Sequence, residues 1–402
     1  MPLGIPITGA GVISAIGNGM DGTLRALLEK RSGVGPVRYL STSHGLLPCG
    51  EVPFSNSSLK EMAGIPSDKI LPRTALLGIQ ALHEALGTAG LTREDISKAA
   101  FISGTTVGGI DITEDRFLDY LEGKGDVTLA HLHDCRGTTA ATEAPFGKFA
   151  FSTTISTACS SAANAIIYGA NLIRAGLYDV VVAGGAESLS RYHLNGFNSL
   201  MILSDEPCRP FDADRKGLNL GEGAAYVVLE SPSHAAKRGA KAIALLDGYG
   251  NECDAFHQTA SSPEGDGAFL AMKEALESAG LTPSDIDYVN AHGTATPNND
   301  ASESAALRRI FGENLPPVSS TKGFTGHTTS ASGSIEAVFC ILAMKEGFLP
   351  CNIGWQKGFE GGIVPVHEDR RGVRLRHVLC NAFGFGGNDS SLLISSPDSI
   401  EQ

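Results

Sequence analysis

Residues Ile155–Ile166 read ISTACSSAANAI and join two different periodicities. The apolar, β-branched run Phe151–Ile155 predicts a buried strand, and the small and apolar residues from Ala162 onward predict a helix. Cys159 therefore lies where a strand turns into a helix. The unpaired N–H groups of a first helical turn favour a thiolate, so this position predicts a nucleophile with a lowered pKa beside an oxyanion site. A cysteine here can equally be a small buried apolar side chain, so its partners elsewhere in the chain must decide.

The chain contains an internal repeat. Glu84–Ile96 reads EALGTAGLTREDI and Glu274–Ile286 reads EALESAGLTPSDI, with nine identical positions at a constant offset of 190 residues. In each copy we expect a helix that ends at a glycine, an Asp-Ile turn and then an apolar strand. Helices that alternate with strands predict α/β layers, here duplicated in two halves, residues 1–245 and 246–402.

A second pair of equivalent helices is predicted. One follows Cys159, and the other runs from about Ser332 to Glu346 with the sequence SGSIEAVFCILAMKE. Both begin with small residues and are apolar along one face, as we expect for central helices packed between two sheets. The nucleophile then belongs to the first half and its partners to the second.

The region at about 110–150 interrupts the first half with a charged helical pattern and a Thr/Ala-rich run, which predicts a surface insertion. It contains His131 and His133, but the pair has no third ligand, so a metal site is the less favoured interpretation. Gly9-x-Gly11 follows the first predicted strand, yet it lacks the third glycine and the immediate helix of a dinucleotide-binding loop. We therefore expect no metal and no nucleotide cofactor.

Composition narrows the choice of partner and compartment. The chain has 402 residues, 42% of them hydrophobic, and a formal net charge of −13, which would repel nucleic acids and anionic membranes. No segment reaches the ~20 apolar residues of a membrane span, and the Met-Pro-Leu-Gly start does not resemble a secretory leader. Eight scattered cysteines without CxxC spacing are typical of a reducing compartment, so a cytoplasmic protein is expected.

Three stretches of the second half carry residues suited to chemistry. Asn290–Thr296 reads NAHGTAT and places His292 just past a predicted strand. Ser319–His327 reads SSTKGFTGH and places Lys322 and His327 before the second central helix. Asn381–Asn388 reads NAFGFGGN, a glycine-rich turn whose backbone N–H groups could approach a ligand. Any one of these could be structural, but their combination with Cys159 in one duplicated chain favours an active site.

The sequence resembles the β-ketoacyl-acyl carrier protein synthases, the elongating, type I/II-like branch of the thiolase-fold condensing enzymes, over nearly its whole length. The matching stretches, in order, are ITGAGVISAIGN, STACSSAANAI, AGGAES, RPFDADRKGLNLGEGAAYVVLE, VNAHGTATPNND, SSTKGFTGHTTSASGSIEA and NAFGFGGND. The resemblance implies a thiolase fold, a duplicated five-layer α-β-α-β-α architecture with pseudo-two-fold symmetry. It also implies decarboxylative Claisen condensation of an enzyme-bound acyl thioester with a malonyl carrier thioester, without metal or cofactor.

Roles for single residues follow from the same resemblance. Cys159 would accept the acyl chain, and His292 and His327 would stabilise the enolate formed when CO₂ leaves, because two N–H donors can share one oxygen without a metal. Lys322 would orient His327, and Glu336 would hold Lys322. The N–H groups of Cys159 and Phe385 would form the oxyanion hole, with Phe385 also gating the acyl pocket. The supporting residues carried over with these are Phe383, Thr294 and Thr296.

Partners are also implied by the resemblance. An acyl carrier protein would deliver both substrates, and the chain would pair through the run Phe149–Ile155 as a homodimer or as a heterodimer with a homologous ketosynthase-like subunit. An acidic carrier needs a local basic patch on this acidic chain, and Arg209, Arg215 and Lys216 form the densest basic cluster near a motif.

Several alternatives stay open at this stage. A specialised synthase with a chain-length-factor-like partner would make polyenes or polyketides rather than ordinary fatty acids. A thiolase would use a second cysteine, for which Cys380 is the candidate, but the pattern of Lys322 and His327 argues against it. A non-catalytic partner subunit would lack the nucleophile. The stretch 138–150 departs from the family pattern where the acyl tunnel is expected, so chain length and saturation stay undetermined.

Overall fold

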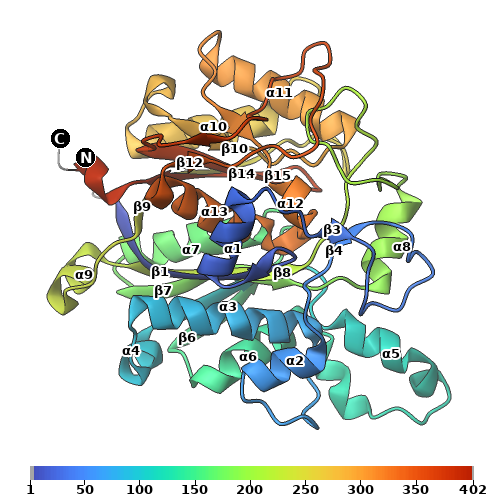
Figure 1. Ribbon diagram of the computed structural model, residues 1–402. Helices are drawn as coiled ribbons and strands as arrows, with labels where there is room; N and C mark the ends of the chain where they lie inside the picture. Colours follow the sequence, from blue (N-terminus) through green and yellow to red (C-terminus); the bar gives the residue numbers. More distant parts are fainter. Residues whose placement is uncertain (1–3, 401–402) are drawn as a thin grey trace.

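The computed structural model describes residues 4–400, which form a layered α/β structure (Figure 1). Helix α3 (Arg73–Ala89) covers one outer face, and α10 (Asp266–Ala279) with α11 (Pro297–Phe311) covers the other. Between the two halves of the sheet lie α7 (Ser161–Arg174) and α13 (Ser332–Glu346). Helix, sheet, helix, sheet and helix thus follow one another, and the predicted five-layer thiolase-type architecture is confirmed.

The sheet has the same strand order twice. In the first half the strands lie in the order β6-β5-β7-β8-β1, and in the second half in the order β11-β10-β14-β15-β9. Numbered along the chain within each half, both orders are 3-2-4-5-1, and β1 and β9 meet where the halves join. The strands are β1 (Ile5–Ser14), β5 (Ala100–Gly104), β6 (Phe151–Ile155), β7 (Val180–Glu187), β8 (Gly223–Glu230), β9 (Ala244–Cys253), β10 (Tyr288–Asn290), β11 (Val318–Ser319), β14 (His377–Gly384) and β15 (Asn388–Ser395).

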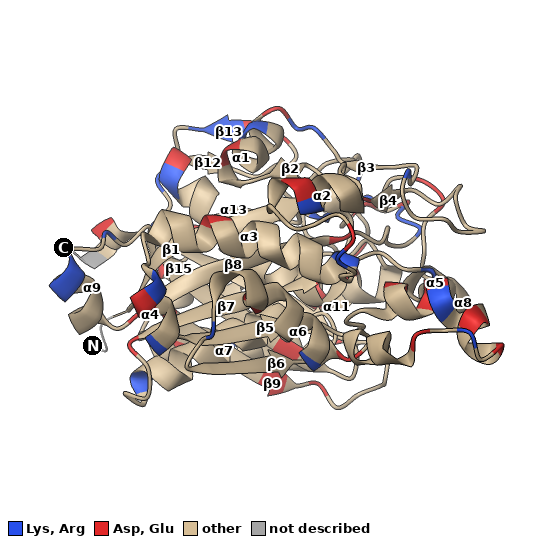
Figure 2. Ribbon diagram, turned by 90° about the horizontal axis from the view of Figure 1, so that it is seen from below, with Lys and Arg blue, Asp and Glu red and all other residues tan. Residues whose placement is uncertain are grey.

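The remaining elements are short and lie around this frame. They are β2 (Gly17–Asn18), α1 (Met20–Leu28), β3 (Val34–Gly35), β4 (Cys49–Gly50), α2 (Asn56–Met62), α4 (Arg93–Lys98), α5 (Ile110–Leu121), α6 (Cys135–Glu143), α8 (Arg191–Ser199), α9 (Pro232–Arg238), α12 (Lys322–Thr325), β12 (Phe348–Leu349) and β13 (Arg370–Arg371). Figure 2 shows that the charged residues are concentrated on these outer elements, whereas the central strands and helices carry few.

The internal repeat corresponds to a repeated contact between helix and strand. On α3, Thr88 Oγ1 accepts from the N–H of Ala10 and donates to its carbonyl; on α10, Ser278 Oγ does the same with Tyr249. The carboxylate that opens each repeat also has the same role, because Glu84 accepts the N–H of Val12 at 2.9 Å and Glu274 accepts that of Asn251 at 2.8 Å. These side chains fix each outer helix in register on the first strand of its half.

Gly9 and Gly11 are explained by this packing. A β carbon at Gly9 would lie 2.6 Å from the backbone N of Ala89, and one at Gly11 would lie 2.6 Å from the backbone N of Ala85, so only glycine lets α3 approach β1 this closely. The Gly9-x-Gly11 pattern therefore serves helix-on-sheet packing. The division into residues 1–245 and 246–402 remains a prediction, which the repeated strand order supports.

Each repeat also ends as the sequence predicts. Gly90 and Gly280 adopt left-handed conformations with φ of 66° and 68° and end α3 and α10. In both copies a threonine and an aspartate then form a reciprocal capping box, Thr92 with Asp95 and Thr282 with Asp285. The identical letters of the repeat thus encode a helix end and the start of the next turn.

The region at about 110–150 is more ordered than the sequence suggests. It forms α5, a 3₁₀ turn and α6, and α6 packs on α3 and β6. His133 Nδ1 lies 2.8 Å from Thr113 Oγ1, and His131 Nδ1 lies 2.5 Å from the carbonyl of Thr128, so each histidine has a partner within the region. Within residues 4–400, no three His, Cys, Asp or Glu side chains are grouped as a metal site.

The strand β6 ends the sheet, and each of its five residues is partly exposed. Its outer edge presents backbone N–H and C=O groups that pair with no other described strand of this chain. This is the run predicted to pair with a second subunit. None of the helices between residues 4 and 400 is long and apolar enough to cross a membrane.

Candidate active site

Cys159 lies in a tight connection between β6 and α7. Ala158 before it has a φ of 52°, and α7 begins only at Ser161. The side chain is buried, and burial raises the pKa of the thiol to about 11, although the ammonium of Lys322 and the backbone N–H of Phe385 both oppose the rise. The prediction of a lowered pKa is therefore wrong, because loss of water outweighs the helix terminus.

His327 is the immediate hydrogen-bond partner of Cys159. Its Nε2 lies 3.0 Å from Cys159 Sγ, and its Nδ1 lies 3.0 Å from Ser332 Oγ. Burial and the nearby Lys322 ammonium hold the pKa of His327 well below its usual value, so the imidazole is neutral at physiological pH. A neutral imidazole can accept the proton of an S–H group, which gives this buried thiol a route to its reactive form.

His292 faces the same space from the other side. Its ring is nearly perpendicular to that of His327, at 85°, with centroids 5.2 Å apart. Lys322 Nζ lies 3.5 Å from His292 Nδ1. Because an ammonium only donates, Nδ1 accepts and Nε2 carries the proton. The prediction that Lys322 orients His327 is wrong: its hydrogen-bond partner is His292.

Lys322 is itself held by Glu336. Lys322 Nζ donates to Glu336 Oε1 at 2.6 Å, and both side chains are almost fully buried. Burial raises the pKa of Glu336 to about 7, against the opposing effect of the Lys322 ammonium. The loop that carries His292 is fixed by Glu303, which accepts the backbone N–H groups of His292 and Gly293 at 2.9 and 2.8 Å. Sequence reasoning missed Glu303, which no motif marks.

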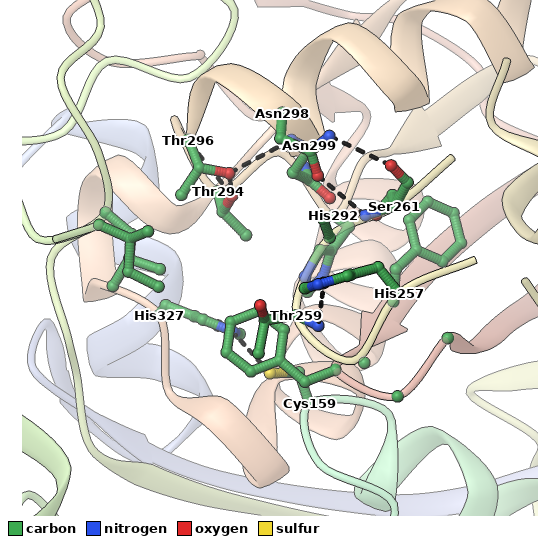
Figure 3. Close-up of a pocket in the computed structure, with 18 of the residues that line it drawn as sticks. Cys159, His257, Thr259, Ser261, His292, Thr294, Thr296, Asn298, Asn299 and His327 are labelled. Atoms are coloured by element: carbon green, nitrogen blue, oxygen red, sulfur yellow. Dashed lines mark hydrogen bonds between the residues drawn. The ribbon is translucent and has the colours of Figure 1, made fainter. Parts of the chain in front are cut away.

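A cavity of about 310 Å³ opens onto Cys159, His292 and His327 (Figure 3). One side is apolar and includes Phe197, Ile202 and Leu218. The other side is polar and consists of threonine, serine, asparagine and histidine side chains from two segments, namely His257, Thr259, Ser261, Thr294, Thr296, Asn298 and Asn299. Figure 3 shows Cys159 and His327 at one end of this space and Thr294 and Thr296 at the other. The cavity therefore suits a ligand that has both polar and apolar parts.

The supporting residues predicted by resemblance lie along this cavity. The ring of Phe383 packs on His292, with centroids 5.6 Å apart, and the partly exposed Phe385 stacks on Phe197 at 5.7 Å. The hydroxyls of Thr294 and Thr296 hydrogen bond to each other at 2.9 Å and line the polar side. The structure thus brings the predicted site residues from both halves of the chain together.

The glycine-rich turn is fastened to the nucleophile loop by Asn388. Its Oδ1 accepts from Ser160 Oγ at 2.7 Å, from Asn164 Nδ2 at 2.6 Å and from Asn251 Nδ2 at 3.1 Å. Gly384 packs so closely that a β carbon there would lie 2.8 Å from the carbonyl of Thr157. These contacts position the backbone N–H of Phe385 at the thiol. Sequence reasoning recognised the turn but missed Asn388 as its anchor.

Models of the two β-ketoacyl synthase domains match most of the chain. The N-terminal domain model matches residues 4–235, and the C-terminal domain model matches residues 243–356. The chain belongs to the β-ketoacyl synthase family. The curated relatives of this family include 3-oxoacyl-acyl-carrier-protein synthase 2 of Vibrio cholerae, 34% identical over 97% of this chain and 98% of that protein. Nodulation protein E of Rhizobium meliloti is 33% identical over 96% and 98% of the two chains.

Solved structures of ketosynthases share the fold. The ishigamide ketosynthase/chain length factor structure is 31% identical and covers 98% of each chain with a TM-score of 0.90. The ketosynthase ApeO in complex with its chain length factor ApeC from Xenorhabdus doucetiae is 32% identical, again over 98% of each chain, with a TM-score of 0.80.

Cys380 is the sequence-based candidate for the second cysteine of a thiolase. Cys380 lies in β14, buried in the same core cluster as Cys340, and it does not line the cavity that opens onto Cys159. This position does not suit the second cysteine of a thiolase.

The basic cluster predicted to dock a carrier is already neutralised. Arg209 pairs with Glu206 at 2.6 Å, and Lys216 pairs with Asp205 at 3.6 Å. Arg215 is only 7% exposed, lies 3.5 Å from Asp300 and covers the ring of Phe359. The prediction of a free basic patch here is therefore not supported by the structure.

The raised pKa of Cys159 predicts a pH dependence for its alkylation. Because only the thiolate reacts, the rate constant with iodoacetamide should rise about tenfold for each pH unit between pH 6 and 9, without a plateau. The alkylated residue is identified by peptide mass spectrometry, and Cys159→Ala serves as the control that lacks the reacting thiol. A plateau reached below pH 8 would mean that the thiol ionises easily.

Asp389, next to Asn388, predicts a pH dependence of stability. Burial, Asp254 and Glu303 raise its pKa to about 8 from an ordinary value of 3.8. The folded state therefore keeps a proton that the unfolded state loses, and stability falls as pH rises from about 4 to about 8. Asp389→Asn should raise the melting temperature by a few degrees at pH 8.5 and by much less at pH 5. An equal shift at both pH values would contradict this assignment.

Proposed function

We propose that this chain catalyses the decarboxylative Claisen condensation of an acyl thioester, held on Cys159, with a malonyl-acyl carrier protein to give a β-ketoacyl-carrier product. The observation that carries the proposal is the convergence of Cys159, His327 and His292 on one buried cavity, with Sγ and Nε2 3.0 Å apart. The family, and relatives named 3-oxoacyl-acyl-carrier-protein synthase, support the same reaction class.

Acyl loading uses Cys159 and His327. The Cys159 thiol gives its proton to His327 Nε2 while the sulfur attacks the incoming thioester. His327 then gives this proton to the departing carrier thiolate. The negative oxygen of the tetrahedral intermediate is stabilised by backbone N–H groups, for which those of Cys159 and Phe385 are our candidates. The backbone N–H of Phe385 lies close enough to the thiol to oppose the rise in its pKa, which supports this choice.

Formation of the carbon nucleophile uses the two histidines. When CO₂ leaves the malonyl group, the remaining thioester becomes an enolate whose oxygen carries the negative charge. Nε2–H of His292 is fixed by Lys322, and Nε2 of His327 faces the same space, so both can donate to that oxygen. The enolate carbon then attacks the Cys159-bound carbonyl, the C–S bond breaks, and the β-ketoacyl chain leaves on the carrier.

The partners belong to the same proposal. An acyl carrier protein delivers both substrates along the polar side of the cavity, and a second subunit pairs with the outer edge of β6. Two structures that share the fold at 31% and 32% identity are ketosynthases with chain length factors, so a heterodimer with a homologous subunit is the second candidate beside a homodimer. We also place the protein in the cytoplasm.

The test is mass spectrometry of Cys159-bound acyl groups. The chain, alone and with any homologous subunit from the same gene neighbourhood, is offered carriers loaded with acyl groups of different length and saturation, followed by malonyl carrier. We expect acylation at Cys159 and then release of a product two carbons longer. Cys159→Ala is the matched control. Acyl groups attached elsewhere, or none with any carrier in either assembly, would refute the proposal.

A further inference from the structure

A chain of buried polar groups continues behind the nucleophile. Cys159 Sγ lies 3.0 Å from His327 Nε2. On the other side of the ring, His327 Nδ1 lies 3.0 Å from Ser332 Oγ, which in turn lies 3.2 Å from Thr328 Oγ1. The four side chains are each between 1% and 4% exposed. Because these groups are shielded from water, each one must find its hydrogen-bond partner within the protein.

The two hydroxyls differ from the usual partners of a catalytic histidine. A carboxylate or carbonyl only accepts and an ammonium only donates, so each of these fixes one tautomer of the ring it touches. His292 is fixed in this way by Lys322. Ser332 can instead accept from an Nδ1–H and donate to Thr328, or accept from Thr328 and donate to a bare Nδ1. The ring proton itself changes nitrogen by exchange with solvent, and rotation of the two O–H bonds lets the hydroxyls follow it.

The backbone of His327 is held by hydrogen bonds that do not involve Ser332, and its ring packs edge-on against His292 with centroids 5.2 Å apart. The backbone N–H donates to the carbonyl of Asn219 at 2.7 Å, and the backbone carbonyl accepts from the N–H of Gly221 at 2.9 Å. Removal of the Ser332 hydroxyl would therefore change the hydrogen bonding of Nδ1 without moving the imidazole away from Cys159.

We propose that Ser332 is a positioning residue that supports both tautomers of His327 and so lets one imidazole serve both stages of the reaction. The inference rests on the proposed condensation. In loading, Nδ1–H donates to Ser332 and the bare Nε2 takes the Cys159 proton, which it returns to the departing carrier sulfur. Between the stages the ring releases the proton on Nδ1 to solvent and takes up one on Nε2. In enolate formation, Ser332 then donates to the bare Nδ1, and Nε2–H donates to the enolate oxygen.

Loss of the hydroxyl should separate the two stages. Ser332→Ala removes the hydroxyl that bonds to Nδ1, and a buried N–H without an acceptor costs more free energy than a bare lone pair, so the Nε2–H tautomer is favoured. That tautomer cannot accept the thiol proton but can still donate to an enolate. We expect acylation of Cys159 to slow by about 10- to 100-fold, while malonyl decarboxylation changes by less than about threefold.

The experiment combines kinetics with ¹⁵N NMR of histidine-labelled protein, in which protonated and bare ring nitrogens have separate shifts. His327 is assigned by the loss of its signals in His327→Ala. Wild type should show both His327 nitrogens with averaged shifts, and Ser332→Ala should show a protonated Nε2 and a bare Nδ1. Ser334→Ala is the matched control, because Ser334 is buried in the same helical turn but hydrogen bonds only to the carbonyl of Ala331. Ser332→Thr should restore the wild-type pattern.

Three results would overturn the inference: unchanged His327 shifts in Ser332→Ala, equal losses of acylation and decarboxylation, or the same effects in Ser334→Ala. If Ser332→Ala does not fold, Ser332→Cys takes its place, because a thiol has a similar volume and hydrogen bonds more weakly. Acylation should then slow more than decarboxylation, by a smaller factor than in Ser332→Ala. A folded Ser332→Cys protein that is acylated at the wild-type rate would contradict the inference. Because the tautomer is read without substrate, a wild-type protein that shows the expected shifts but no condensation would contradict the proposed function alone.

Discussion

Replacement of Cys159 by alanine is expected to reduce condensation by at least about 10⁴-fold, since the acyl chain then has no nucleophile to hold it. The change removes one sulfur from a buried site that Ser160 and Ser161 otherwise fasten by their hydroxyls, so the fold should survive. Product formation is followed with acyl and malonyl carriers, and folding by the melting temperature and circular dichroism.

The same variant should retain malonyl decarboxylation, because the histidine pair that stabilises the enolate is still present. Cys253→Ala is a suitable control, since Cys253 is exposed at the end of β9 and outside the cavity. A folded Cys159→Ala protein that forms product at the wild-type rate would remove Cys159 from the reaction.

His292→Ala and His327→Ala are each expected to lower malonyl decarboxylation by about 10²–10³-fold, the usual effect of losing one donor to a developing oxyanion. The two variants should differ in acyl loading. His327 contacts Cys159 Sγ, so His327→Ala should also slow acylation, whereas His292 contacts Lys322 and Phe383 and not the thiol. Release of CO₂ and acylation of Cys159 are measured separately on each variant.

Cys380→Ala completes this comparison. Cys380 is buried beside Cys340 and does not line the cavity, so its loss should leave both rates within about twofold of wild type. The opposite pattern, with turnover lost in Cys380→Ala and decarboxylation unaffected in both histidine variants, would favour thiolase chemistry.

The architecture was largely predictable because its signals are local. The repeat predicts a helix end at a glycine, and both helices end as expected at Gly90 and Gly280. The capping boxes that follow, at Thr92 and Thr282, are found only in the structure. The strand Phe151–Ile155 and the helix Ser332–Glu346 also have the predicted bounds. Patterns of this kind depend on neighbours in the sequence, which the sequence displays directly.

The electrostatics of the site were not predictable in the same way, because they depend on contacts between distant residues. The pKa of Cys159 is raised by burial under both halves of the chain, which no local pattern reveals. Lys322 lies only five residues from His327, yet its side chain points to His292, thirty residues away. Arg215 pairs with Asp300 and covers the ring of Phe359, and neither neighbour is close to it in the sequence. Motifs thus identify which residues meet, but not how they pair.

The repeated strand order has a consequence for how such a protein can diverge. Helices α7 and α13 each lie between the third and fourth strands of their half, and the segments that lead into them carry Cys159 and His327 respectively. Equivalent segments of the two halves thus carry different reactive groups, a thiol in the first half and an imidazole in the second. In the proposed reaction the first would hold the acyl group, whereas the second would act both in loading and in enolate formation. Substitutions near the second segment should therefore affect both stages, so a change of acyl specificity is expected to be tolerated better in the first half.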